Sequence, residues 1–391
     1  VTIMKVKDIN SKLNLKNHND TKSKFSMTAT KILKSRYAGY AVLAIAIILI
    51  ILLNQAGIVK RSTLSAITKI LVYFIAVLGF NLLMGYSGLS SLGTAGFIGI
   101  GAYITGILVG QHKLPLILAL ALVIVASILL GTIVGFVSLR IEGIYLAIVT
   151  LGLSEILARL FTELAEITKG DEGINFLAET LRPIAGVIPH TTTISIVLVL
   201  IMVIFLMFIT TNIMTSPLGR AFLSMKNSTS AAQAMGIGLL KHRLLAFVIS
   251  TVFAGISGLF YAAYFRSVQP QLWDIMLSLN ILAAVVIGGS KSVWASFGGT
   301  VLIFGLQPLL LDNLGIDEKL NIPNIINGVL IVLIVMFFNG GLIQMFNIAK
   351  KRIDARLEKR KEEKWRNRYG SQSYYNQTPE DFIIAQHQRV K

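Results

Sequence analysis

Long apolar runs separated by short polar stretches dominate the hydropathy pattern of this chain. The hydrocarbon core of a bilayer is about 30 Å thick, and about 20 residues of apolar helix are needed to cross it. Ten runs approach that length: residues 37–53, 64–84, 92–109, 114–137, 144–164, 193–211, 244–264, 275–289, 297–311 and 325–338. We predict about ten membrane-spanning segments, within a range of eight to eleven, and some of the short or glycine-broken runs can re-enter without crossing.

These runs are predicted to be helices. A segment surrounded by lipid must satisfy its own backbone hydrogen bonds, and a single helix does so. A closed barrel instead needs strands of about ten residues in which apolar and polar positions alternate. The continuous runs of Ile, Leu, Val and Ala do not alternate in this way. We therefore predict an all-α, polytopic integral membrane protein.

The charges between the runs indicate the orientation. The stretch 212–243 carries four Lys or Arg and no acid, whereas the stretch 165–192 is net acidic. Because positively charged loops stay in the cytoplasm, we place the loops 85–91, 138–143, 212–243 and 290–296 inside. Ten crossings then put both termini in the cytoplasm.

Both ends of the chain are polar and basic. Residues 1–36 hold nine Lys or Arg against two acids, and residues 350–391 hold twelve against six. We divide the chain into a disordered cytoplasmic tail at 1–36, a transmembrane domain at 37–345 and a basic cytoplasmic tail at 346–391. The net charge of +17 is explained by these flanks of membrane spans, which argues against nucleic acid as a partner.

The composition excludes several classes of function. Hydrophobic residues make up 54% of the chain and charged residues only 14%, too few to cover the surface of a soluble multidomain enzyme. The chain has no Cys, and its five His residues lie far apart, so we expect neither thiol chemistry nor a metal site. Residues 288–292 lack the spacing of a phosphate-binding loop. We expect no catalytic residue, no cofactor and no ATPase site here.

Residues 81–110 form the most informative segment, with the sequence NLLMGYSGLSSLGTAGFIGIGAYITGILVG. Each glycine in a helix interior costs about 1 kcal/mol relative to alanine, so a stiff helix throughout is not expected. In one interpretation the small residues let helices approach closely, as in the GxxxG pair Gly106 and Gly110. In the other, residues 85–93 break the helix beside a translocation path. Both interpretations can hold for different glycines.

Polar side chains inside apolar runs are candidates for lining such a path. They are Asn81, Ser87, Ser90, Thr94, Thr150, Glu155 and Asn280. Thr150 and the nearby Ser154 also suit hydrogen bonds between helices. Glu155 and Arg159 are four residues apart and can pair on one helix, and the alternative role for this pair is to anchor the outer end of that helix.

The stretch 216–243 is the one long inner loop. Ser216 and Pro217 are a favourable helix start, with Pro217 in the first helical position. Residues 230–235 are predicted to form a short helix of small residues, which Gly236 or Gly238 closes. Because its side chains are small, this helix offers a flat surface on which another protein can dock.

Several motifs, in this order, resemble the permease subunits of branched-chain amino-acid ABC transporters and of the wider family that serves urea, sugars and nucleosides. They are NLLMGYSGLSSLGTAGFIGIGAY (81–103), GIYLAIVTLGLSEI (143–156), SPLGRAFLSMKNSTSAAQAMGI (216–237), LLAFVISTVFAGISGLFYAAY (244–264) and LNILAAVVIGGSKSVWASFGGTVLI (279–303). The chain departs from the family pattern at Thr94, where His is usual, at Leu89, where Gln is common, and near Ala231, where a Glu is usual.

The resemblance implies an ABC importer permease fold in a bacterial cell membrane. It implies a coupling helix, made of Ser230, Ala231, Ala232, Gln233 and Gly236 and supported by Arg220, that docks on a cytoplasmic ATPase subunit. The other implied partners are a second permease subunit, identical or different, and an extracytoplasmic binding protein that delivers a small polar solute. Branched-chain amino acids are the first expectation for that solute. The alternatives are urea, nucleosides or sugars in the same family, or an ATP-independent secondary transporter.

Overall fold

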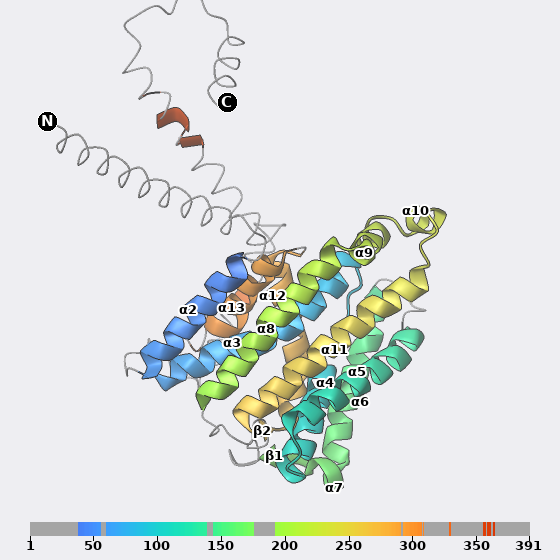
Figure 1. The fold of residues 1–391 in the computed structure, drawn as a ribbon. Helices are drawn as coiled ribbons and strands as arrows, with labels where there is room; N and C mark the ends of the chain where they lie inside the picture. The colour runs from blue at the N-terminus through green and yellow to red at the C-terminus, as the bar shows by residue number, and fades with distance from the viewer. Residues whose placement is uncertain are drawn as a thin grey trace, which may run out of the picture.

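The computed structural model describes residues 38–55, 60–138, 144–175, 192–290 and 292–306, together with a few isolated residues between 308 and 363. Within these ranges nine of the ten predicted runs are helical, and the helices pack side by side in one bundle (Figure 1). Almost all of the tenth run, 325–338, lies outside the described residues. The prediction of an all-α polytopic membrane protein is confirmed.

The main helices follow the apolar runs closely. They are α2 (Ala38–Gln55), α3 (Arg61–Phe80), α4 (Thr94–Thr105), α5 (Leu116–Ser138), α6 (Ile144–Glu163), α8 (Thr192–Thr215), α11 (Leu239–Phe265), α12 (Ile275–Gly288) and α13 (Val293–Leu306). Two wider turns extend α3 and α4: the π-helices η1 (Asn81–Tyr86) and η2 (Gly106–Gln111). The connecting segments include α7 (Ala165–Thr168), η3 (Gly170–Glu172), α9 (Pro217–Asn227), α10 (Thr229–Ala234) and η5 (Pro270–Trp273).

Helix length divides the bundle into two groups. Six described helices are long and apolar enough to cross a membrane: Arg61–Tyr86, Thr94–Gln111, Leu116–Val137, Tyr145–Glu163, Thr193–Thr215 and Leu239–Phe265. By contrast α12 has 14 residues, which at 1.5 Å per residue gives a length of about 21 Å, less than the hydrocarbon thickness. Before it, the chain turns back through the short strand β2 (Ser267–Val268) and η5, and Trp273 at the end of η5 is fully buried.

The connecting segments sort to the two ends of the bundle. At one end Lys226 of α9 contacts Gly85 of η1, and Asn81 of η1 donates to the carbonyl of Ser292. The segments 85–91, 212–243 and 290–296 therefore meet at a common end, as the loop charges predicted. At the opposite end (Figure 1), the strand β1 (Ile174–Asn175) pairs with β2 in antiparallel register, Ile174 opposite Val268.

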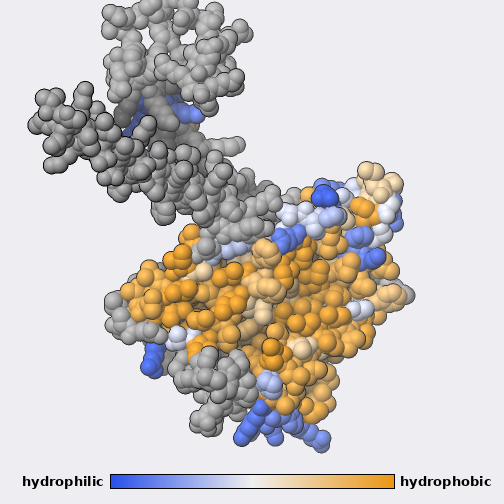
Figure 2. Space-filling view, viewed as in Figure 1, coloured by the Kyte–Doolittle hydropathy of each residue, from blue (hydrophilic) through white to orange (hydrophobic). Residues whose placement is uncertain are grey.

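Apolar side chains cover the outside of the bundle as well as its centre. Figure 2 shows an orange surface over the helices, with blue side chains gathered towards the two ends. The exposed apolar residues include Ile117, Val125, Leu129 and Ile133 of α5 and Ile148 and Ile156 of α6. A surface of this kind is stable against lipid tails and not against water. The bundle thus presents a membrane-facing belt between two polar ends.

Glycine permits a very close helix contact between α4 and α11. A Cβ atom added at Gly101 would lie 2.0 Å from the carbonyl oxygen of Gly255, and one added at Gly258 would lie 1.9 Å from that of Ile98. Close packing of small residues is a main source of helix association in lipid. Gly106 of the predicted pair does not make this contact. Gly106 lies in η2, where an added Cβ would touch Ile174 at an ordinary 3.5 Å, because the two helices cross nearer Gly101.

Candidate functional site

The helix that begins as α3 breaks where the sequence predicted. It widens into η1, and residues 87–93 then run without helical structure until α4 starts at Thr94. Gly88 in this break has a φ of +75°, a left-handed conformation that glycine adopts without strain. The break confirms the prediction of an interrupted helix within residues 85–93.

The start of α4 is closed by side chains from other helices. Its N-cap position, Gly93, has no side chain to satisfy the first amides of the helix, which would otherwise lack partners. The amide of Ala95 donates to Ser278 Oγ of α12 at 2.9 Å, and that of Gly96 donates to Ser154 Oγ of α6 at 3.1 Å. The amide of Leu92 donates to Thr150 Oγ1 at 2.9 Å. Hydrogen bonds therefore join α4, α6 and α12 at this break, and we call this point the joint.

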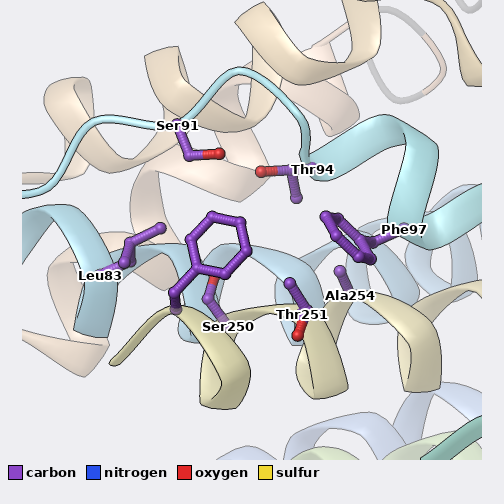
Figure 3. Close-up of a pocket in the computed structure, with 8 residues that line it drawn as sticks. Leu83, Ser91, Thr94, Phe97, Ser250, Thr251 and Ala254 are labelled. Carbon is purple, nitrogen blue, oxygen red and sulfur yellow. The ribbon is translucent and has the colours of Figure 1, made fainter. Parts of the chain in front are cut away.

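A pocket opens beside the break (Figure 3). It is small, and its lining comes from η1, the break, α4 and α11. Ser91 and Thr94 approach from the chain above it, and Ser250, Thr251 and Ala254 from α11 below (Figure 3). Leu83, Phe97 and Phe247 supply apolar surface.

The pocket lining combines hydroxyl groups with apolar side chains. None of its eight lining residues is charged, and four of them carry hydroxyls that can donate or accept hydrogen bonds. Backbone that has left a helix is tolerated at membrane depth where it lines a cavity. The break and this pocket are therefore the candidate translocation site.

The loop 212–243 folds into two short helices that project beyond the bundle. Ser216 caps α9, accepting a hydrogen bond from the amide of Gly219, and Pro217 occupies the first helical position. This confirms the predicted helix start. Ser228 caps α10 in the same way, accepting from the amide of Ala231 at 3.3 Å. In Figure 1 α10 forms the tip of this projection.

Gly236 closes α10, as predicted. Its φ is +79°, its amide donates to Gln233 O, and the amide of Ile237 donates to Ala232 O. This pair of bonds is a Schellman motif, which ends a helix at a left-handed residue. Ala232 is buried beneath the helix, whereas Met235 is 84% exposed. The exposed part of α10 also includes Ser230, Ala231, Gln233 and Gly236.

The comparisons with known proteins agree on one family. The family model described as "Branched-chain amino acid transport system / permease component" matches residues 62–338. This chain belongs to that permease family. The high-affinity branched-chain amino acid transport system permease protein LivM of Salmonella typhimurium is 32% identical over 286 residues, which cover 68% of this chain and 67% of that protein.

Two further relatives carry the same kind of name. LivM of Escherichia coli is 32% identical over 275 residues, 65% of each chain. A probable branched-chain amino acid transport permease protein LivM of Methanocaldococcus jannaschii is 24% identical over 314 residues, 70% of this chain and 90% of the relative. This permease thus spans about two thirds of the length of the two bacterial relatives. No solved structure is significantly similar to it.

The permease brings only part of its predicted path residues to the pocket. Thr94 lines it. Ser87 hydrogen-bonds to the carbonyl of Leu83, and Asn81 to that of Ser292, so both stabilise the end of η1. Ser90 is half-buried in the break, and Asn280 is half-buried on α12. Thr150 and Ser154 join α6 to the break and to α4, which confirms their predicted role in contacts between helices.

Glu155 lies away from the pocket. Its Oε1 pairs with Arg159 Nε at 3.2 Å, and the two side chains are 57% and 77% exposed. The predicted i, i+4 pair is therefore present, on the outer face of α6. A role for Glu155 in the path stays a prediction. Arg220, predicted to support the coupling loop, is exposed on α9 and donates to the carbonyl of Thr215 at the end of α8.

Sequence reasoning missed Lys226. This residue lies in the last turn of α9 and reaches the carbonyl oxygens of Met84 and Gly85 in η1. The partner carbonyls precede it by more than 140 residues. The only local signal was a lysine near the C-terminus of a short helix, which is common and points to no particular partner.

Proposed function

We propose that this chain is the membrane-spanning permease subunit of an ABC importer that takes up branched-chain amino acids. The observation that carries the proposal is α10, a helix fixed by a cap at each end that presents its surface beyond the bundle. A separate ATPase subunit supplies the energy, and a conformational change of the bundle moves the solute. The chain itself provides the translocation path and the helix α10, through which the ATPase subunit moves the bundle.

The docking role of α10 is supported by its exposed side chains. Met235 is 84% exposed at the tip, next to the small residues Ala231 and Ala234. A large exposed apolar side chain surrounded by small ones is typical of a contact surface between proteins. Because this loop carries only basic charges, its end of the bundle is assigned to the cytoplasm, with both termini on the same side. The two bacterial relatives favour the bacterial cell membrane.

The pocket supports the assignment of the solute. Phe97, Phe247 and Leu83 offer apolar surface to an aliphatic side chain, while Ser91, Thr94, Ser250 and Thr251 offer hydroxyls to a polar head group. An uncharged lining favours neither an anion nor a cation, and its hydroxyls can hydrogen-bond the ammonium and carboxylate groups of a zwitterion. The names of the relatives point to the same solutes. A binding protein delivers the solute at the β1–β2 end, and a second permease subunit completes the membrane part.

Removing the docking surface tests this proposal. We expect Met235→Asp, or deletion of residues 228–236, to abolish leucine uptake and retention of the ATPase subunit while membrane insertion stays normal. Asn175→Asp is the matched control for retention of the ATPase subunit, because Asn175 is exposed in β1 and the same charge is added at the end opposite α10. Retention of the ATPase subunit by Met235→Asp at the native level would contradict the docking role.

Two further measurements test orientation and solute. The native chain has no cysteine, so a single Cys at position 235 is its only thiol. We expect it to be labelled in inside-out vesicles and protected in intact cells from a reagent that cannot cross the membrane. Direct ligand binding by the partner binding protein then identifies the solute, and urea or a nucleoside in place of leucine would replace the assignment.

A further inference from the structure

Lys226 connects the projecting α9–α10 segment to the wall of the pocket. Its Nζ donates to the carbonyl oxygen of Gly85 at 2.8 Å and to that of Met84 at 3.3 Å. The side chain is half-buried. The two carbonyls belong to η1, whose Leu83 lines the pocket and whose chain continues into the break.

The two carbonyls are those that the end of η1 leaves open. Further back, the carbonyl of Leu82 accepts from the amide of Ser87, and that of Leu83 accepts from the amide of Leu89. The helix then stops, and no following turn supplies donors for Met84 and Gly85. A lysine ammonium carries three donors and a positive charge, which the negative end of a helix favours. Lys226 thus completes the end of η1 from a different helix.

The aliphatic stem of Lys226 makes a second contact with the break. A Cβ atom added at Gly88 would lie 3.0 Å from Lys226 Cγ and 3.4 Å from its Cβ. Gly88 is also the residue with a φ of +75° that turns the chain away from η1. The ammonium therefore contacts the end of η1, and the stem lies against Gly88 in the break.

On its other side Lys226 is close to the docking surface. It lies two residues before Ser228, which caps α10, so a displacement of α10 is carried to Lys226 through a short, capped segment. We propose that Lys226 is a positioning residue that transmits the movement of α10 to η1 and the break, and so to the pocket. This inference rests on the proposed function, because it assumes that an ATPase subunit moves α10.

The first test compares three variants in the complete transporter, reconstituted in liposomes with its ATPase subunit, second permease subunit and binding protein. Lys226→Met keeps the stem and removes the donors, Lys226→Arg keeps donors and charge, and Lys241→Met removes an exposed lysine in the first turn of α11. The readouts are leucine uptake, ATP hydrolysis stimulated by the leucine-loaded binding protein, and the amount of ATPase subunit retained.

For Lys226→Met we expect uptake to fall at least tenfold while the ATPase subunit stays bound and ATP hydrolysis continues. The ratio of leucine moved to ATP hydrolysed then falls, which a loss of folded protein alone would not cause. Lys226→Arg should recover at least a third of native uptake, and Lys241→Met should stay within twofold of native. Uptake and coupling ratio within twofold of native in Lys226→Met would overturn the proposal.

A covalent substitute gives a second test, independent of the ammonium. The 3.4 Å separation of the two Cβ positions is just below the range of about 3.5–4.5 Å that a disulfide needs, and the chain has no other cysteine. Because Gly88 has a φ of +75°, a side chain there is strained, so the oxidised and reduced forms of the same double variant are compared. In Gly88→Cys/Lys226→Cys we expect oxidation to restore coupled uptake at least fivefold over the reduced form, with Lys226→Cys alone unresponsive. A formed disulfide that restores nothing would overturn the proposal.

The variants at Met235 and Lys226 distinguish a failure of the proposed function from a failure of the role of Lys226. If the native permease does not retain an ATPase subunit, or Met235→Asp has no effect on that retention, the proposed function fails. If the native permease retains it and Lys226→Met keeps a native coupling ratio, the proposed function stands and the role of Lys226 fails.

Discussion

Helices α11 and α5 both have the length to cross a membrane, but they occupy different places in the bundle. In the most apolar window of α11, 72% of the residues are buried inside the protein, against 22% for α5. Yet α5 is the more apolar helix, although the two helices carry similar shares of Gly, Ser, Ala and Thr. In a soluble protein the more apolar helix would be the buried one.

The difference shows what holds this bundle together. Lipid tails are as apolar as leucine, so burying leucine on another helix gains little, whereas close contact and hydrogen bonds between helices gain more. The centre therefore contains Gly101, Gly255 and Gly258, and Ser257 Oγ donates to the carbonyl of Val72 at 2.8 Å. The rim helix α5 presents branched apolar side chains to lipid instead.

The largest effect is expected where the central helices touch. Gly258→Val places its Cβ 1.9 Å from the carbonyl oxygen of Ile98, so α4 and α11 must separate, at a cost of about 3 kcal/mol or more. We expect little folded protein by size-exclusion chromatography in detergent. Gly152→Val on the rim helix α6 is the control, because an added Cβ there meets nothing within 4 Å. Equal losses in both variants would abolish the distinction between centre and rim.

A smaller loss is expected at the joint that closes α4. Ser278→Ala leaves the buried amide of Ala95 without its hydroxyl partner, which costs about 1–3 kcal/mol. Thermal unfolding in detergent should show a lower midpoint for this variant. Ser224→Ala on the exposed side of α9 should leave the midpoint unchanged, and a native midpoint for Ser278→Ala would show that another group satisfies the amide.

On the rim, a substitution should stabilise. Gly152→Ala removes the backbone freedom of a glycine in the middle of α6 without meeting another atom, which gains about 0.5–1 kcal/mol. The same change at the centre, Gly258→Ala, should destabilise, so the two variants differ in sign. Thermal midpoints of the two purified proteins measure this directly. A loss of stability in Gly152→Ala would mean that the outer face of α6 is covered in the purified protein.

The smallest effect is expected at the ion pair on the same rim helix. Glu155 and Arg159 are both largely exposed, and exposed pairs contribute about 0–1 kcal/mol. We expect Glu155→Gln to move the midpoint in detergent little, and a double-mutant cycle with Arg159→Met should give a small coupling energy. If Glu155→Gln abolished uptake at native stability, the predicted role of Glu155 in the path would gain support that the structure does not give.

The sequence was sufficient for features with a local cause. Apolar length predicted nine helices of the described part, glycine content predicted the break before Thr94, and Ser216, Pro217 and Gly236 marked helix ends by their own chemistry. The prediction for α11 began too late, at residue 244. Its first turns contain Lys241 and Arg243, which hydropathy assigns to a loop although the helix simply continues past the apolar run.

Features that depend on distant partners were beyond the sequence. The closure of α4 by Ser278, the choice of Gly101 over Gly106 as the crossing point, and the contact from Lys226 to η1 each join segments far apart in the chain. A serine in an apolar run or a lysine at a helix end has many possible partners. Only the packing of the bundle selects one, which is why Thr94 alone of the seven predicted path residues lines the pocket.

The hydrogen bonds at the start of α4 also determine how water can enter the bundle. Any tilt of α4 away from α6 and α12 separates the amides of Ala95 and Gly96 from their hydroxyl acceptors, and bare amides at membrane depth are unstable. Incoming water molecules are the acceptors that can replace those hydroxyls. An opening movement that parts α4 from these two helices therefore requires water to enter at the start of α4.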